Sequence, residues 1–140
     1  MEPQNKTIAI ADKDTSLTDL IDAVAKRIGF EVRKMTVGIG TKPQDVASFV
    51  QGIVPDMVLL AENYGTISTA PEGLKYPDLK QGEGIDALVE IRGRVYTGPV
   101  YMISANPQHE EQALAQGANG YMPITSDIKK LSEFLESSMR

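Results

Sequence analysis

The sequence contains no cysteine and no tryptophan, and His109 is its single histidine. Without thiols the chain can form neither disulfides nor thiolate zinc or iron–sulfur sites, and it lacks a cysteine nucleophile. One histidine is also too few for most histidine-based catalysis or metal binding. These absences favour a reducing, cytoplasmic setting and exclude several classes of enzyme.

Long hydrophobic runs are missing as well, and positive charge is in deficit. Residues 1–5 are polar, and no window approaches the roughly eighteen consecutive apolar residues of a membrane-spanning helix. Nineteen acidic residues against fourteen Lys and Arg give a net charge of −5, which disfavours a surface for nucleic-acid phosphates or anionic lipid. We therefore expect no membrane attachment and no direct binding of nucleic acid.

What is present fits one globular domain. The 140 residues are 41% hydrophobic but only 6% aromatic. A single core is therefore expected over residues 1–140, built mainly from Val, Ile, Leu, Ala and Met.

Short apolar segments alternate with amphipathic ones along the chain. Residues 57–61 form the most continuously apolar segment, which predicts a central strand buried on both faces. Residues 64–83 sustain neither periodicity and predict a long loop. The sequence predicts strands at 7–11, 31–37, 57–61, 99–104 and 121–122, and helices at 15–28, 41–52, 85–91, 106–117 and 126–135.

Helix boundaries and buried faces follow from particular residues. Thr41 and Gln44, with Pro in the first turn, predict a capping box, and Ser126 can cap the last helix. Helical spacing places Val89 and Ile128 on the inner faces of their helices.

Five strands that alternate with five helices predict right-handed crossovers and a parallel sheet covered on both faces. The expected architecture is an open α/β sandwich of the flavodoxin-like type. In such folds the functional crevice lies at the carboxyl ends of the strands. The residues expected there are 12–14, 61–63, 104–105 and 123–125.

Five segments of the chain together resemble the receiver domains of two-component response regulators. They are KTIAIADKD at 6–14, PDMVLL at 55–60, GIDAL at 84–88, PVYMISA at 99–105 and the stretch 113–122. The resemblance covers residues 6–139 apart from the long loop. It implies a CheY-like three-layer sandwich with a five-stranded parallel sheet, and a role in phosphorelay signal transduction.

The resemblance also implies a phosphorylation site, and the sequence departs from it. In that family two acidic residues follow the first strand and an Asp that accepts the phosphoryl group ends the third. A Thr or Ser ends the fourth strand and a Lys the fifth. The carboxylates hold Mg²⁺ and the Lys stabilises the transferring charge. The matching residues here are Asp12, Lys13 and Asp14, then Ala61 and Asn63, then Ser104, and finally Ile124, with a switch-like aromatic at Tyr121.

These departures remove the chemistry. Ala61 has no atom that can attack phosphorus, so we expect no enzymatic phosphoryl transfer. A slip of one residue would place Glu62 there, but it would also turn every side chain of the strand over. Lys13 is expected to pair with Asp12. With Asp14 as the only other carboxylate, we expect neither a bound metal nor a cofactor.

The favoured hypothesis is therefore a phosphorylation-independent pseudo-receiver that acts as a protein-interaction module. The resemblance implies interaction surfaces on the helix at 106–117, the strand at 121–122 and the last helix. The expected partner is a signalling protein or a second copy of the chain. The alternative is a small-ligand-sensing domain that uses the emptied crevice and the loop at 64–83.

Overall fold

The computed structural model describes residues 6–13, 15–38, 41–61, 83–94, 96–104, 110–122 and 127–138. The strands are β1 (Thr7–Asp12), β2 (Glu31–Thr36), β3 (Met57–Ala61), β4 (Val100–Ile103) and β5 (Gly120–Met122). The helices are α1 (Thr15–Ile28), α2 (Pro43–Ile53), α3 (Glu83–Gly93), α4 (Glu110–Ala115) and α5 (Ile128–Ser138). Strands and helices alternate in the order that the sequence predicts.

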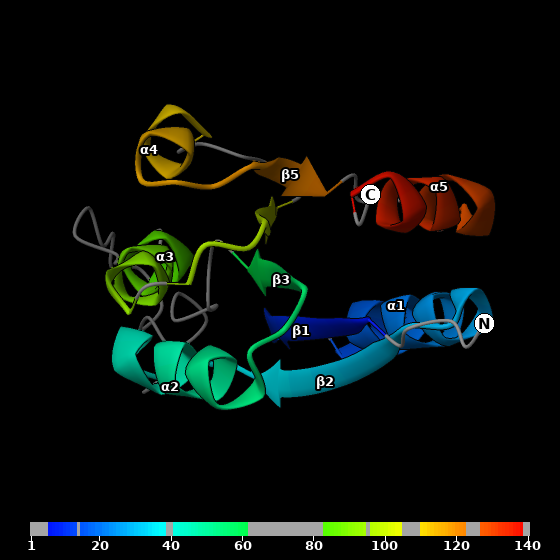
Figure 1. Ribbon diagram of the computed structural model, residues 1–140, viewed down its shortest axis with the longest axis horizontal. Coiled ribbons are helices and arrows are strands. Elements are labelled where there is room, and N and C mark those ends of the chain that lie inside the picture. The colour runs from blue at the N-terminus through cyan, green and yellow to red at the C-terminus, as the bar shows by residue number, and fades with distance from the viewer. Residues whose placement is uncertain are drawn as a thin grey trace, which may run out of the picture.

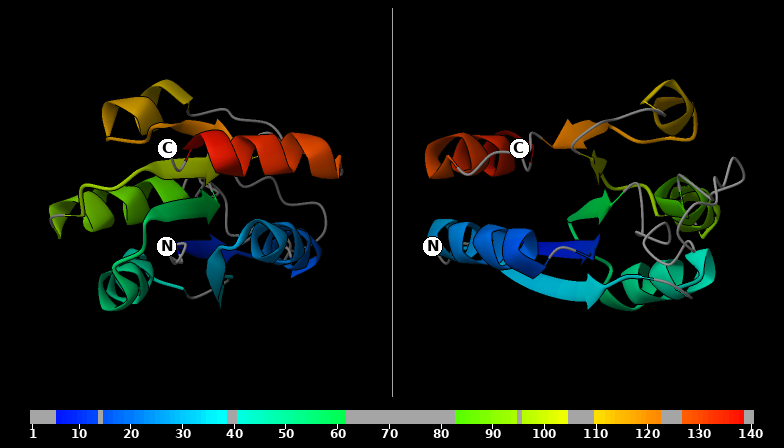
Figure 2. Two further views of the ribbon diagram at one scale, coloured as in Figure 1. Left: turned by 45° about the vertical axis from the view of Figure 1, so that its right-hand side comes forward. Right: turned by 180° about the vertical axis from the view of Figure 1, so that it is seen from behind.

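The five strands form one parallel sheet in the order β2-β1-β3-β4-β5. Helices α1 and α5 cover one face, and α2, α3 and α4 cover the other (Figures 1 and 2). This is the flavodoxin-like, CheY-like three-layer sandwich that the sequence predicts. The chain reverses its direction of travel across the sheet after β2, which leaves β1 and β3 in the middle.

The core consists of two layers, one on each face of the sheet. All five residues of β3 are buried, as expected for a central strand that lacks polar positions. Residues 57 to 60 of β3 alternate between the layers. Ile10 and Leu59 pack with the cluster under α1 and α5, whereas Val58 and Leu60 pack with the cluster under α2, α3 and α4.

The cap predicted for α2 is wrong, and the cap predicted for α5 is untested. In α2 the Asp45 carboxylate accepts the Lys42 backbone N–H at 3.0 Å, so the helix is capped one residue later than predicted. The Thr41 hydroxyl instead accepts the Gly38 N–H at 3.0 Å. In α5 Asp127 accepts the N–H groups of residues 129 and 130, which satisfies the first-turn donors. Ser126 lies outside the described residues.

Two apolar residues predicted to face the core are exposed instead. Val89 is 43% exposed on α3 and Ile128 is 47% exposed on α5. Neighbouring positions such as Leu88 and Leu131 are fully buried and already fill the inner faces. The buried face of each helix is therefore one position narrower than the periodicity predicts.

Val54, which ends α2, has a left-handed backbone conformation with φ 51° and ψ 61°. Its N–H donates to the Val50 carbonyl at 2.9 Å. A β-branched side chain is strained there, and at 75% exposed it contributes little burial. We expect Val54→Gly to raise the free energy of unfolding by about 0.5–1 kcal/mol, as measured by urea denaturation. A loss of stability would show that the Val54 side chain packs usefully.

Some predictions fall outside the described residues. They include the loop at 64–83 apart from the first residue of α3, and the start of the fourth helix at 106–109. Among the helices that are described, none has the length and apolar character needed to cross a membrane.

Candidate functional site

The predicted site lies at the carboxyl ends of the central strands. In the pairing of β1 with β3, Ala11 lies opposite Leu60, so the next residues, Asp12 and Ala61, end their strands at the same level. In the pairing of β3 with β4, Ala61 lies opposite Ile103. The register thus brings Asp12 and Ala61 to the same level at the carboxyl end of the sheet, as the sequence predicts.

Asp12 is a buried carboxylate, with 6% of its surface exposed. It ends β1 beside Thr36, and its backbone carbonyl accepts the Val37 N–H at 3.1 Å. The backbone of β2 therefore holds this end of β1 in place. A buried carboxylate is costly in a fold unless it is paired or hydrogen-bonded, so Asp12 contributes a carboxylate to this end of the sheet whose burial the fold must compensate.

Lys13 does not pair with Asp12 as predicted. Its side chain is exposed, and none of the ion pairs between described residues joins it to Asp12. The residue lies just beyond the end of β1, where the strand no longer fixes the direction of the side chain. The pairing of Lys13 with Asp12 is therefore not supported, although Lys13 still stands where the resemblance expects an acidic residue.

Ala61 ends β3 at the position that the resemblance assigns to the phosphoryl acceptor. It is 3% exposed and packs within the apolar cluster under α2, α3 and α4. A methyl group can neither attack phosphorus nor bind a metal ion. The centre of the candidate site therefore carries no reactive atom.

Ser104 and Tyr121 occupy the places that the resemblance gives to switch residues. Ser104 directly follows β4, one residue beyond the partner of Ala61, and is half-buried. Tyr121 lies opposite Met102 in β5 and packs against the cluster under α2, α3 and α4. Ser104 is thus the first residue after β4, next to the partner of Ala61.

Asp14, Asn63 and Ile124 lie outside the described residues, as do Glu62 and His109. The part of the chain that the structure describes contains no group of three His, Asp or Glu side chains that could hold a metal ion. From this part of the chain, the site receives one carboxylate, from Asp12.

An ionic cluster that the sequence does not predict joins β2 to α1. Lys34 of β2 contacts Asp22 of α1 at 3.1 Å and Asp19 at 3.4 Å, and Lys26 lies 3.3 Å from Asp22. Burial raises the pKa of Asp22, but the hydrogen bonds and charges of Lys34 and Lys26 outweigh it, so the pKa is lowered. The spacing of Asp22 and Lys26 was the available signal. The cluster fastens α1 to the edge strand.

The hydrogen bonds of Arg92 to Gly117 and Asn119 are not predicted from the sequence either. They join segments that are far apart in the sequence, and no local pattern indicates them.

Comparison with known proteins places the fold. No protein-family model and no curated protein matches the sequence. The receiver domain of NtrX from Brucella abortus superposes with a TM-score of 0.68 at 19% identity, over 94% of this chain and 97% of that one. CheY4 of Vibrio cholerae superposes with a TM-score of 0.69 at 15% identity, over 96% and 99%. A longer NtrX structure from B. abortus gives 0.71 at 19% identity over 97% of this chain, which spans only 27% of that chain. At such identities the comparisons establish the receiver fold alone.

Proposed function

We propose that this chain is a pseudo-receiver, a signal-transduction module that binds a partner protein without being phosphorylated and without catalysing a reaction. The proposal rests on the presence of Ala61 at the acceptor position. A buried alanine ends the central strand where a receiver needs an acidic acceptor. The cytoplasmic setting inferred from the absence of cysteine belongs to the same proposal.

The retained architecture supports a binding role. In the described residues, the parallel sheet, its covering helices and the Ser104 and Tyr121 positions match those of a receiver, whereas the acceptor position does not. A fold that has lost its chemistry can still present a surface, because function depends on the site and not on the fold. Binding therefore accounts for what the chain keeps.

Two exposed apolar residues lie on helices to which the resemblance assigns an interaction surface. Leu114 of α4 is 46% exposed and Ile128 of α5 is 47% exposed. Between these helices in the chain, β5 forms the edge of the sheet and carries the half-buried Tyr121. Large apolar side chains on a surface are typical anchors for a protein partner. We propose that α4, β5 and α5 form the interaction surface, for a signalling protein or for a second copy of the chain.

Photo-crosslinking in cells tests this surface. A photoreactive amino acid at position 114 or 128 is expected to yield a discrete crosslinked species, identified by mass spectrometry. The matched control is position 54, because Val54 is 75% exposed but follows α2, away from the proposed surface. Equal yields of the same species from all three positions would contradict the proposal.

A further inference from the structure

Arg92, in the last turn of α3, joins the α3–β4 connection to the α4–β5 connection. Its Nη1 donates to the Tyr96 carbonyl at 2.9 Å and to the Gly98 carbonyl at 2.7 Å, both in the α3–β4 connection. Its Nε and Nη2 donate to the Gly117 carbonyl at 3.1 and 2.6 Å, and Nη2 also donates to Asn119 Oδ1 at 3.1 Å. One guanidinium thus fixes the α4–β5 connection to α3.

Asn119 extends this contact into the sheet. Its side-chain Oδ1 accepts the Val100 N–H at 3.0 Å, and its own N–H donates to the Val100 carbonyl at 2.7 Å. Val100 is the first residue of β4, and Asn119 directly precedes β5. Arg92 therefore orients the residue that sets the start of β5 against the start of β4.

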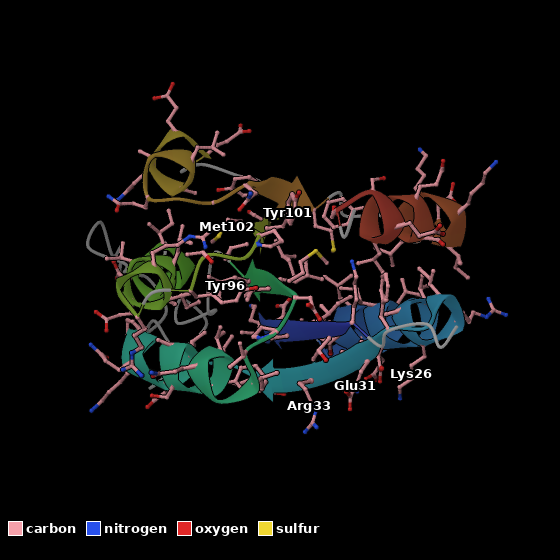
Figure 3. All side chains as sticks on the ribbon, viewed as in Figure 1. Lys26, Glu31, Arg33, Tyr96, Tyr101 and Met102 are labelled. Carbon is pink, nitrogen blue, oxygen red and sulfur yellow. The ribbon has the colours of Figure 1, made fainter. Side chains whose placement is uncertain are left out.

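The guanidinium is held by neutral groups and not by a carboxylate. No ion pair between the described residues includes Arg92. Its carbon lies 5.8 Å from the centre of the Tyr96 ring, and the Tyr96 hydroxyl donates to the Pro55 carbonyl at 2.9 Å. Figure 3 shows Tyr96 beside α3. Burial lowers the pKa of Arg92, so the hydrogen bonds must replace water around a permanent charge.

We propose that Arg92 is a conformational latch, which holds the α4–β5 segment in one position against α3 and β4 by binding the carbonyls of Gly98 and Gly117 and the side chain of Asn119. The role of that segment as an interaction surface rests on the function proposed above. The latch itself does not, because it is a property of the isolated chain. As a consequence, an internal contact sets the position of the surface on α4 and β5, and no phosphoryl group is needed to set it.

A latch differs from an ordinary stabilising residue in the part of the domain that opens when the residue is removed. Loss of a merely structural residue lowers the stability of the whole domain, so all slowly exchanging amides accelerate by the same factor. Loss of a latch opens one segment while the rest stays closed. The Val100 and Asn119 amides report on this segment, and the amides of β1 and β3 report on global unfolding.

Native-state hydrogen exchange, followed by NMR on the isolated chain, tests the latch with Arg92→Met. We expect the Val100 and Asn119 amides to exchange at least about tenfold faster relative to the β1 and β3 amides. Arg94→Met is the matched control. Arg94 lies one residue beyond the end of α3 and donates to Ser48 Oγ at 2.9 Å and Gln51 Oε1 at 3.0 Å, which ties α3 to α2 instead. The control should leave that ratio unchanged.

Arg92→Lys provides a second, milder variant in case Arg92→Met does not fold. A lysine ammonium keeps the charge but cannot reach carbonyls in both connections with the geometry of the guanidinium. We expect the same selective acceleration, reduced in size. Uniform acceleration of all core amides in the folded variant, or no change, would overturn the latch. Since neither a partner nor a phosphoryl donor is used, this outcome is independent of the proposed function.

Discussion

Incubation of the protein with acetyl phosphate and Mg²⁺ is expected to leave its mass unchanged. Ala61 offers no oxygen to attack phosphorus, and Ile124, by the resemblance, stands where an amine would stabilise the transferring charge. Intact-mass spectrometry and phosphate-sensitive electrophoresis measure the outcome, with an active receiver domain as positive control. A stoichiometric gain of one phosphoryl group would contradict the proposed function.

Introducing an acceptor through Ala61→Asp alone is also expected not to restore phosphorylation. Ala61→Asp would place a second carboxylate at a buried position level with Asp12, where like charges oppose ionisation of both. Lys13 is exposed, and none of the ion pairs between described residues joins it to Asp12, so we infer that the obstacle is the acidic residue that Lys13 replaces. We expect Ala61→Asp to lower the stability and to remain unphosphorylated. Normal phosphorylation of this single variant would show that the other departures are harmless.

Restoration of three positions together should recover the metal site. Lys13→Asp, Ala61→Asp and Ile124→Lys supply two carboxylates beside Asp12 and one cation, the set that Mg²⁺ and a phosphoryl group require. The expected result is stabilisation by Mg²⁺ in a thermal-shift titration, because a ligand that binds only the folded state raises its stability. Adding Asp12→Asn to the triple variant is the control and should abolish the response. Indifference of the triple variant to Mg²⁺ would mean that the backbone of this edge has also diverged.

The sheet could be predicted from the sequence because short, continuous apolar runs indicate buried strands. Residues 57–61 were predicted as a buried central strand, and β3 has these bounds with every residue buried. The ends of the remaining strands differ from the predicted ends by at most one residue. Alternation of strands and helices then leaves few topologies. The meeting of Asp12 and Ala61 at one edge follows from that topology alone.

What the sequence did not predict depends on contacts between distant residues or on competition between neighbours. Arg92 reaches Gly117 and Asn119 across 25 and 27 positions, a distance over which no periodic pattern extends. Asp127 caps α5 with its carboxylate, although the preceding Ser126 is an equally suitable residue type. The direction of the Lys13 side chain is likewise unconstrained by β1. Side-chain partners therefore required the structure.

The same substitution at two leucines is expected to separate packing from binding. Leu60 is fully buried in the middle of the sheet, whereas Leu114 is 46% exposed on α4. Leu60→Ala should lower the free energy of unfolding by about 3–5 kcal/mol, because it removes apolar contacts and leaves a cavity. Leu114→Ala should cost less than about 1 kcal/mol, since its side chain is already partly hydrated. Urea denaturation of the two variants measures both values.

Leu114→Ala is expected to weaken partner binding and not folding. If Leu114 anchors a partner, its truncation lowers the yield of the crosslink formed from position 128 while the unfolding curve stays close to that of the unchanged protein. Val89→Ala is the matched control, because Val89 is 43% exposed but lies on α3. It should affect neither measurement strongly. A loss of stability from Leu114→Ala as large as that from Leu60→Ala would assign Leu114 to the core. An unchanged crosslink in Leu114→Ala would remove α4 from the proposed interaction surface.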